Sequence, residues 1–225
     1  VGLELSHGIE PFIITATDDN LKEYAWEFPV NPKTRKVKYS LAGLKECRSL
    51  LKRKQLVFHN GGFDIKALAN AGIYLRIPSW RDGCQPINFT KTEPVAKFRV
   101  NGIEDTLNAA HICYSDEQHG LKYLAARYLG IPSDDEKQLK EAVRIARAEG
   151  KRRGWKLGVN YKGENEPLYD YWMPKAVNPK SKECLTYGLK DAYRTMLLHL
   201  LLEEIMDENA PFRKSYEEEM DGVGE

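Results

Sequence analysis

The stretch QLVFHNGGFD, residues 55–64, decides the fold. Its first five residues, QLVFH, form a short and largely apolar run, which predicts a buried strand. The NGG that follows predicts a turn. Phe63–Ala71 then predicts a helix that ends at Gly72, a residue type common just beyond a helix C-terminus. The strand therefore leads into a glycine turn, and Asp64 lies in the first turn of the next helix.

A second acidic side chain lies on a helix near the other end of the chain, in YGLKD at residues 187–191. Apolar residues recur at helical spacing from about Glu183 to Asp207, which predicts one long helix. Tyr187 and Asp191 are four residues apart, so their side chains lie on one face of that helix. A phenol and a carboxylate arranged in this way can share one small ligand or one water molecule.

A third acidic position is expected on a strand at the N-terminus. Val1–Ser6 alternates, with Leu3 and Leu5 on one face and Glu4 and Ser6 on the other. Only the second face carries side chains that could bind a cation.

The rest of the chain predicts an α/β fold with a mixed sheet, because strands come first, then strands alternate with helices, and helices come last. The expected strands are Pro11–Thr17 and Leu21–Val30. Three of the expected helices are Ser40–Lys54, with Ser40 as N-cap, Thr106–Tyr114 and Gly120–Leu129. A charged helix is expected to begin at a capping box of Ser133 and Glu136 and to end at about Arg153. A long surface loop is expected to follow it at Gly154–Ser181.

Composition excludes several classes of protein. The chain has 225 residues, enough for one domain with a substantial core, and its net charge of +1 argues against a nucleic-acid packaging protein. The four cysteines include no CxxC pair, which argues against a zinc site. No apolar run is long enough to span a membrane and no signal peptide is visible. The chain begins without Met, as expected for a fragment of a longer protein.

The order of these motifs resembles the DEDD superfamily of 3′–5′ exonucleases. HNGGFD fits the pattern HNxxFD, and YGLKD fits the YxxxD of the tyrosine subgroup. Between them, EDTL at 104–107 looks like the family's DT helix start, and HGLKYLA at 119–125 looks like its HgLKxLA helix. The resemblance is to the proofreading domain of phage and bacterial family A DNA polymerases, and it implies a ribonuclease-H-like mixed sheet flanked by helices.

By this resemblance, residues 1–210 form the exonuclease-like domain, with a family-specific helix-and-loop insertion at 133–182. Residues 211–225 begin a linker, and a polymerase domain is the expected C-terminal partner. The other expected partner is the 3′ end of a single-stranded nucleic acid, DNA or RNA, in the cytoplasm of a bacterial or phage-infected cell. No membrane partner is expected.

The resemblance also implies two-metal hydrolysis of phosphodiesters with two Mg²⁺ or Mn²⁺ ions. Asp191 would bind the metal on the nucleophile side, Asp64 would act near the second metal, and Glu4 would be a further ligand. Tyr187 would orient the attacking water. The residues expected to contact the nucleic acid are His59, Asn60 and Phe63. Asp105 is interpreted as a helix N-cap rather than a catalytic residue.

The first motif departs from the family pattern, which is DxE. Strand alternation puts Glu4 in the Asp position and Ser6 in the Glu position. Glutamate is one methylene longer than aspartate and serine carries no charge, so a site with three carboxylates would bind divalent cations less tightly. Two hypotheses follow: an active exonuclease with a weakened metal site, or a degenerate exonuclease fold that binds single-stranded nucleic acid or supports a polymerase.

Two surface features have alternative interpretations. The Lys and Arg clusters at residues 33–38 and 144–153 are either solvated faces or a path for a phosphate backbone. Four of the aromatic residues in the 154–181 loop either stack on unpaired bases or pin the loop to the core. These aromatic residues are Tyr161, Tyr169, Tyr171 and Trp172.

Overall fold

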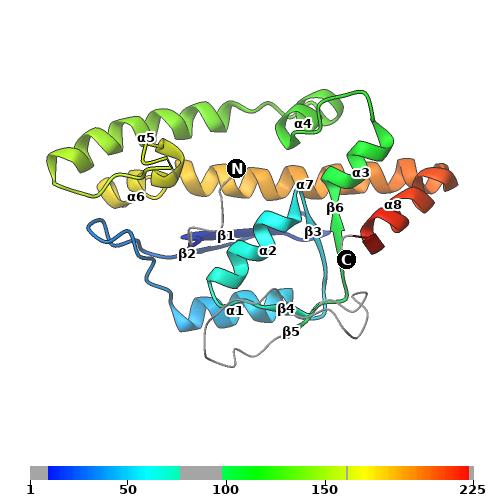
Figure 1. The fold of residues 1–225 in the computed structure, drawn as a ribbon, viewed down its shortest axis with the longest axis horizontal. Coiled ribbons are helices and arrows are strands. Elements are labelled where there is room, and N and C mark those ends of the chain that lie inside the picture. Colours follow the sequence, from blue (N-terminus) through cyan, green and yellow to red (C-terminus); the bar gives the residue numbers. More distant parts are fainter. Residues whose placement is uncertain (1–9, 77–97, 161, 223–225) are drawn as a thin grey trace.

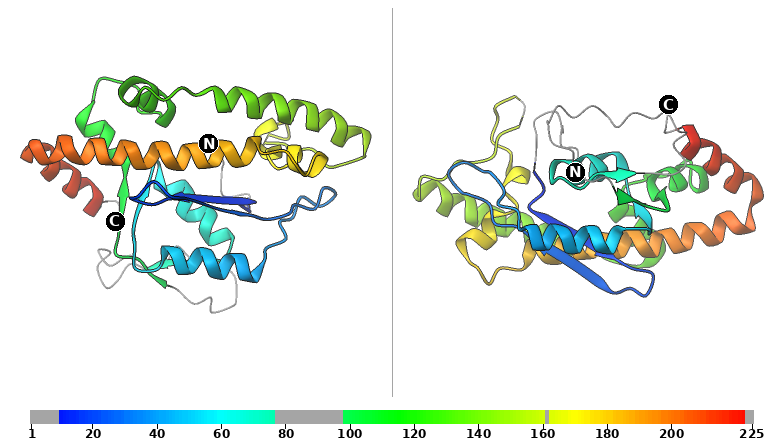
Figure 2. Two further views of the ribbon diagram at one scale, coloured as in Figure 1. Left: turned by 180° about the vertical axis from the view of Figure 1, so that it is seen from behind. Right: turned by 90° about the horizontal axis from the view of Figure 1, so that it is seen from below.

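The computed structural model describes residues 10–76, 98–160 and 162–222, and it confirms the predicted α/β class. Its longest element is helix α7 (Glu183–Glu208), which crosses the molecule (Figure 1). Strand β1 (Ile13–Thr17) packs on one side of α7, and α4 (Leu121–Leu129) and α5 (Asp134–Arg152) pack on the other side. The view from behind, on the left of Figure 2, shows the same arrangement. Helix α7 therefore lies between the strands and the α4–α5 layer.

The strands pair in twos within the described residues. β1 (Ile13–Thr17) and β2 (Glu23–Glu27) are antiparallel, with Ile13 opposite Glu27. β3 (Gln55–Phe58) and β6 (Gly102–Asp105) are parallel, as are the two-residue strands β4 (Leu75–Arg76) and β5 (Phe98–Arg99). The strand predicted at residues 1–6 lies outside the described residues.

Helices α1 (Leu41–Leu51) and α2 (Gly61–Asn70) pack with the strands around a first hydrophobic core. Ser40 caps α1 as predicted, because its side chain accepts a hydrogen bond from the backbone of Gly43 at 3.2 Å. Gly72 has a φ of +78°, a left-handed conformation suited to glycine, which confirms that α2 ends just before it. The buried residues of this core are Trp26, Phe28, Leu44, Cys47, Leu56, Leu68, Ala71, Ile73 and Val100.

A second core joins α3 (Thr106–Cys113), α4, α7 and α8 (Ala210–Gly222). Leu124 of α4 and Leu198 and Leu202 of α7 are fully buried in it. Tyr216 of α8 is only 4% exposed and packs in the same core. The residues after Pro211, interpreted from the sequence as the start of a linker, thus contribute a buried side chain to this core.

The segment at residues 133–182, expected from the sequence to be an insertion, contains more helix than expected. The predicted loop includes a 3₁₀ helix (η2, Pro167–Asp170) and α6 (Met173–Val177), and both pack on α5. Trp172 and Met173 are buried against α5, so Trp172 pins the segment to the core.

The capping box predicted at the start of α5 is wrong. Ser133 precedes the helix, but its side chain accepts no cap hydrogen bond. Glu136 instead forms ion pairs with Lys122 of α4 and Lys140 of α5. Lys122 contacts one carboxylate oxygen at 2.9 Å and Lys140 contacts the other at 2.6 Å, so both oxygens that a capping box could use have cationic partners.

Within the described ranges, no helix combines the length and hydrophobicity that crossing a bilayer requires.

Candidate active site

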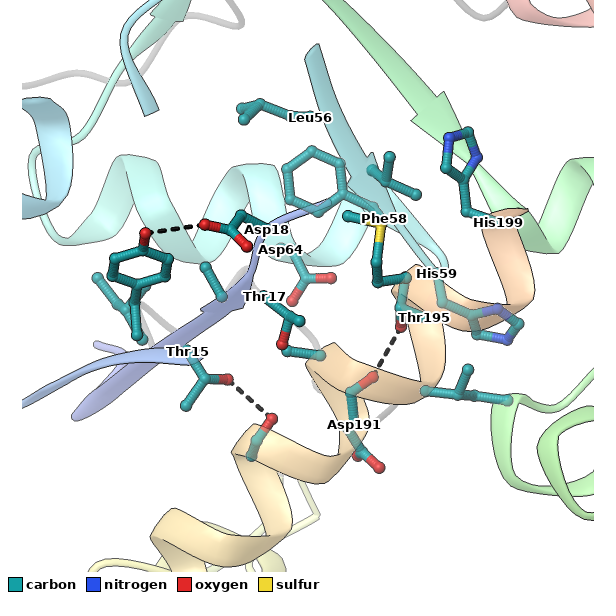
Figure 3. Close-up of a pocket in the computed structure, with 18 of the residues that line it drawn as sticks. Thr15, Thr17, Asp18, Leu56, Phe58, His59, Asp64, Asp191, Thr195 and His199 are labelled. Atoms are coloured by element: carbon teal, nitrogen blue, oxygen red, sulfur yellow. Dashed lines mark hydrogen bonds between the residues drawn. The ribbon is translucent and has the colours of Figure 1, made fainter. Parts of the chain in front are cut away.

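A cleft of about 970 Å³ brings together the acidic side chains of the two helical motifs. Strands β1 and β3 and helices α2, α4 and α7 line it. Asp64 comes from the first turn of α2, and Asp191 comes from α7 (Figure 3). Tyr187 lies one helical turn before Asp191 and lines the same cleft. The structure therefore places three of the four predicted catalytic residues in the lining of one cleft.

The residues predicted to contact nucleic acid, His59, Asn60 and Phe63, also line this cleft. The remaining predicted ligand, Glu4, and its neighbour Ser6 lie outside the described residues. Their role stays a prediction from the sequence.

Asp105 fixes the turn that presents Asp64. Its carboxylate accepts hydrogen bonds from the backbone N–H groups of Asn60 at 3.0 Å and Gly61 at 2.7 Å. It also accepts from the N–H of Leu107 at 2.9 Å, so it caps α3 as predicted. Asn60 has a φ of +68°, a left-handed conformation that asparagine tolerates better than most residues. One carboxylate thus satisfies the exposed N–H groups at the start of two helices.

A contact with Thr106 holds the ring of His59 in place. Its Nδ1 lies 2.9 Å from the Thr106 hydroxyl, which donates its own proton to the carbonyl of Phe58 at 3.0 Å. Because that hydroxyl has one proton, His59 Nδ1 must carry the hydrogen in this contact. Burial also lowers the pKa of His59, which favours the neutral ring.

Close approach of α7 to β1 positions the YGLKD segment. The Thr15 hydroxyl donates to the carbonyl oxygen of Gly188 at 2.9 Å. A β-carbon at Gly188 would lie 3.0 Å from the methyl group of Thr15, so a larger residue would push the helix away from the strand. Glycine at this position keeps Tyr187 and Asp191 at the wall of the cleft.

Lys122 of α4 contacts the tyrosine of the motif. Its ammonium donates to the Tyr187 hydroxyl oxygen at 2.9 Å and to the Glu136 carboxylate at 2.9 Å. Because an ammonium can only donate, the proton of the Tyr187 hydroxyl is left to point elsewhere. Burial raises the pKa of Tyr187, and the Asp191 carboxylate adds to that rise, so Tyr187 stays protonated at neutral pH.

A buried arginine holds Asp191. Arg194 has no exposed surface, and its guanidinium donates to the Asp191 carboxylate at 3.0 Å. It also donates to both carboxylate oxygens of Asp135, at 2.5 and 3.0 Å, and to the carbonyl of Pro132 at 2.6 Å. Asp135 is 2% exposed and lies at the start of α5. One guanidinium therefore ties the Asp191 carboxylate to the start of α5.

Asp64 and Asp191 are side chains of the cleft that could hold a divalent cation. Burial raises the pKa of Asp64 to about 6, and the carboxylates of Asp105 and Asp191 add to the rise. Burial also raises the pKa of Asp191, although Lys122 and Arg194 oppose the rise. Partly buried carboxylates that repel each other are stabilised by a divalent cation, and oxygen ligands suit Mg²⁺ and Mn²⁺.

Comparison with protein families decides what this site belongs to. The family model DNA_pol_A_exo1, described as 3′–5′ exonuclease, matches residues 33–207. That range contains Asp64, Tyr187 and Asp191 and covers most of the chain. The chain belongs to this family of 3′–5′ exonuclease domains. A comparison with curated proteins found no match.

Three residues of the exonuclease domain's site were not predicted from the sequence: Lys122, Asp135 and Arg194. Lys122 lies within the HGLKYLA motif, so its motif position was the available signal. Arg194 follows Asp191 by three residues, a spacing that allows contact on a helix. Asp135 had no local signal, because its contact with Arg194 spans 59 residues of sequence.

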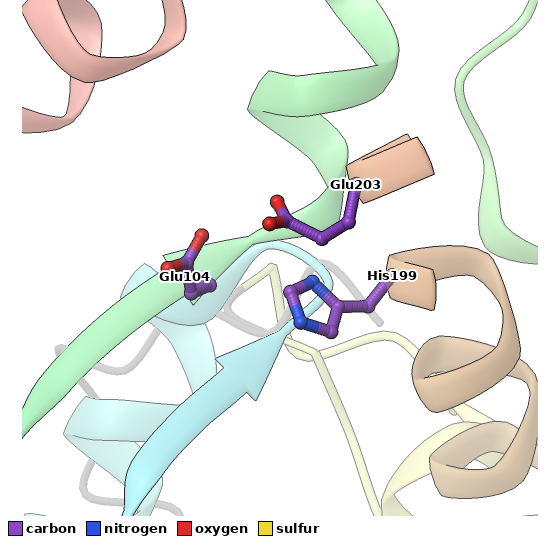
Figure 4. Close-up of side chains that lie close together, drawn as sticks. All are labelled: Glu104, His199 and Glu203. Atoms are coloured by element: carbon purple, nitrogen blue, oxygen red, sulfur yellow. The ribbon is translucent and has the colours of Figure 1, made fainter. Parts of the chain in front are cut away.

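The exonuclease domain also contains a second cluster with metal-ligating side chains, Glu104, His199 and Glu203 (Figure 4). Their ligand atoms lie within 4.8 Å of one another. Arg213 donates to both carboxylate oxygens of Glu203 at 3.0 Å, and Tyr216 donates to Glu104 at 3.0 Å. Both carboxylates therefore have hydrogen-bond donors within the protein, and Arg213 balances the charge of Glu203.

The raised pKa of Asp64 predicts how metal-free stability depends on pH. A carboxyl group has a pKa near 3.9 in the unfolded chain and about 6 at Asp64 in the fold. The folded state therefore binds more protons between these values, and its stability falls as pH rises through this window. We expect Asp64→Asn to raise the melting temperature by a few degrees at pH 8 and by little at pH 4, in EDTA.

The control for this measurement is Asp19→Asn, an exposed carboxylate at the rim of the same cleft. Its melting temperature should follow that of the wild type at both pH values. Equal shifts for Asp64→Asn at pH 4 and pH 8 would show that ionisation of Asp64 does not strain the metal-free fold.

Proposed function

We propose that this exonuclease domain removes nucleotides one at a time from single-stranded 3′ ends by metal-dependent hydrolysis of phosphodiesters. The observation that carries the proposal is the meeting of Asp64 and Asp191 in one cleft, beside Tyr187. Proofreading of DNA beside a polymerase domain is the biological role that fits this family best.

The reaction adds water across the terminal phosphodiester. The water oxygen forms a bond to phosphorus, the bond from phosphorus to the 3′-oxygen breaks, and that oxygen takes up a proton. The products are a nucleoside 5′-monophosphate and a strand one nucleotide shorter. Bound Mg²⁺ or Mn²⁺ would supply a hydroxide nucleophile at neutral pH and would stabilise the leaving oxygen.

The residues of this chain have separate parts in that reaction. Asp64 and Asp191 would hold the ions, with Glu4 as a further ligand. Tyr187 stays protonated and accepts from Lys122, so its own proton would be donated to the Asp191 carboxylate or to the attacking water. His59, Asn60 and Phe63 would contact the last nucleotides of the strand.

A second candidate function is binding of single-stranded nucleic acid without turnover. One observation favours it: Asp191 already accepts a hydrogen bond from Arg194, which balances part of its charge. The unusual Glu4 and Ser6 motif points the same way.

The deciding experiment is incubation of the purified chain with a 5′-labelled single-stranded oligonucleotide, with Mn²⁺, Mg²⁺ or EDTA. We expect a ladder that shortens from the 3′ end with either ion and stops in EDTA. An oligonucleotide that binds and stays intact with both ions would reject the enzyme and support the second candidate.

A further inference from the structure

A groove of about 720 Å³ lies next to the active-site cleft, between α5 and the segment from Glu166 to Tyr171. Lys122 and Tyr187 line both hollows, so the groove begins beside the proposed catalytic tyrosine. Helix α5 forms one wall of the groove and the segment from Glu166 to Tyr171 forms the other. A strand whose 3′ end lies in the cleft can therefore extend into this groove.

One face of α5 gives the groove its charge. Lys140, Arg144 and Arg147 lie on that face, three or four residues apart, and line the groove with Lys122. Two carboxylates, Glu136 and Glu166, line it as well, so cations are in excess.

Two of these cations are available to a ligand. The side chains of Lys140 and Arg144 are 61% and 72% exposed, and each pairs with a glutamate of its own helix. Exposed pairs of this kind contribute at most about 1 kcal/mol. A phosphate can therefore replace the glutamate partner at little cost. Arg147 is held by the buried Asp170 and keeps its position.

The opposite wall of the groove carries apolar and aromatic side chains on which bases can pack. Pro167 and Leu168 are apolar, and the ring of Tyr171 lies edge-on to Tyr187, with 6.1 Å between ring centroids. Stacking of one base on an aromatic side chain contributes roughly 1–3 kcal/mol. Phosphate-binding cations on one wall and a stacking surface on the other fit a single strand better than a duplex, whose bases are already stacked.

We propose that this groove binds the nucleotides that precede the 3′ terminal residue of a single strand, with their phosphates on α5 and a base on Tyr171. The inference rests on the proposed function for the placement of the 3′ end. It assigns the insertion a role in holding substrate several nucleotides away from the hydrolysed bond.

The test measures binding in EDTA, where no hydrolysis occurs, by fluorescence anisotropy with labelled oligothymidylates of three and ten nucleotides. Arg144→Ala and Lys140→Ala should each weaken binding of the ten-mer about three- to tenfold. Each should also reduce the slope of log affinity against log salt by about 0.7, as expected for one lost phosphate contact on a single strand. Tyr171→Leu should weaken the ten-mer at least fivefold at every salt concentration. Binding of the trinucleotide should not change.

Arg152→Ala is a closely matched control for Arg144→Ala. Both arginines pair with a glutamate three residues earlier on α5, and their side chains are 80% and 72% exposed, but only Arg144 lines the groove. Lys137, exposed on α5 and absent from the groove lining, is the control for Lys140.

Three results would overturn the groove: equal losses in the groove variants and their controls, equal losses for the two oligonucleotides, or equally tight binding of a ten-base-pair duplex. If the groove variants lose affinity for the ten-mer as expected but the chain hydrolyses no oligonucleotide, the proposed exonuclease activity is rejected and the groove remains a binding site for a single strand.

Discussion

Asp191→Ala is expected to reduce the rate of 3′-end shortening by about 10³-fold or more. A metal ligand at the reacting phosphate contributes several kcal/mol of transition-state stabilisation, and each 1.4 kcal/mol corresponds to a factor of ten. The fold should persist, because Arg194 keeps its contacts with Asp135 and the carbonyl of Pro132. The measurement is the initial rate of shortening in Mn²⁺, together with the melting temperature.

Asp19→Ala provides the comparison for this variant. Asp19 is an exposed carboxylate that lines the same cleft, so its loss changes the net charge equally without removing a proposed ligand. Its rate of 3′-end shortening should stay within about twofold of the wild-type rate, because a surface substitution away from the proposed ligands has a small effect. Similar rates for Asp191→Ala and the wild type would exclude Asp191 as a metal ligand.

The parts of the site that the sequence predicted are those encoded by short local patterns. HNGGFD combines a strand, a glycine turn and a helix start within ten residues, so the position of Asp64 follows from local preferences. Tyr187 and Asp191 are related by helical periodicity alone. Their meeting in one cleft was expected only from the resemblance to the exonuclease family, and the structure places them there.

The features that the sequence did not predict depend on contacts between distant segments. The predicted capping box is wrong because Glu136 forms ion pairs with two lysines, one of which lies on another helix. The predicted loop at 154–181 contains helical turns because Trp172 and Met173 are buried against α5. Asp170, fully buried, also binds Arg35 from a segment 135 residues earlier.

Arg194→Met is expected to lower the free energy of unfolding by about 3–5 kcal/mol at neutral pH. Removing one partner of a buried ion pair leaves the other charge buried and uncompensated, and effects of this size are typical. The charge left behind is Asp135, which is 2% exposed and retains only the more distant Lys190 ammonium, at 3.9 Å, among its described ion-pair partners. Urea unfolding at pH 7, followed by circular dichroism, measures the loss.

The same variant should lose less stability in acid. Burial alone would raise the pKa of Asp135, but hydrogen bonds from Arg194 bring it below its ordinary value. A carboxyl group with a lowered pKa stabilises the fold above its unfolded pKa, near 3.9, and that stability disappears as pH falls through the folded value. The difference in the free energy of unfolding between Arg194→Met and the wild type should therefore become smaller below about pH 4.

Arg194→Met should also raise the Mn²⁺ concentration that gives half-maximal exonuclease rate by about tenfold or more. A group that orients a metal ligand typically contributes 10–100-fold to metal affinity or activity, and Arg194 donates to Asp191 at 3.0 Å. Arg35→Met is the matched control, since Arg35 pairs with the buried Asp170 outside the cleft. It should lower stability and leave the Mn²⁺ dependence unchanged. A lower Mn²⁺ requirement in Arg194→Met would mean that the guanidinium competes with the ion for Asp191. That result would support the second candidate function, a degenerate domain that binds nucleic acid.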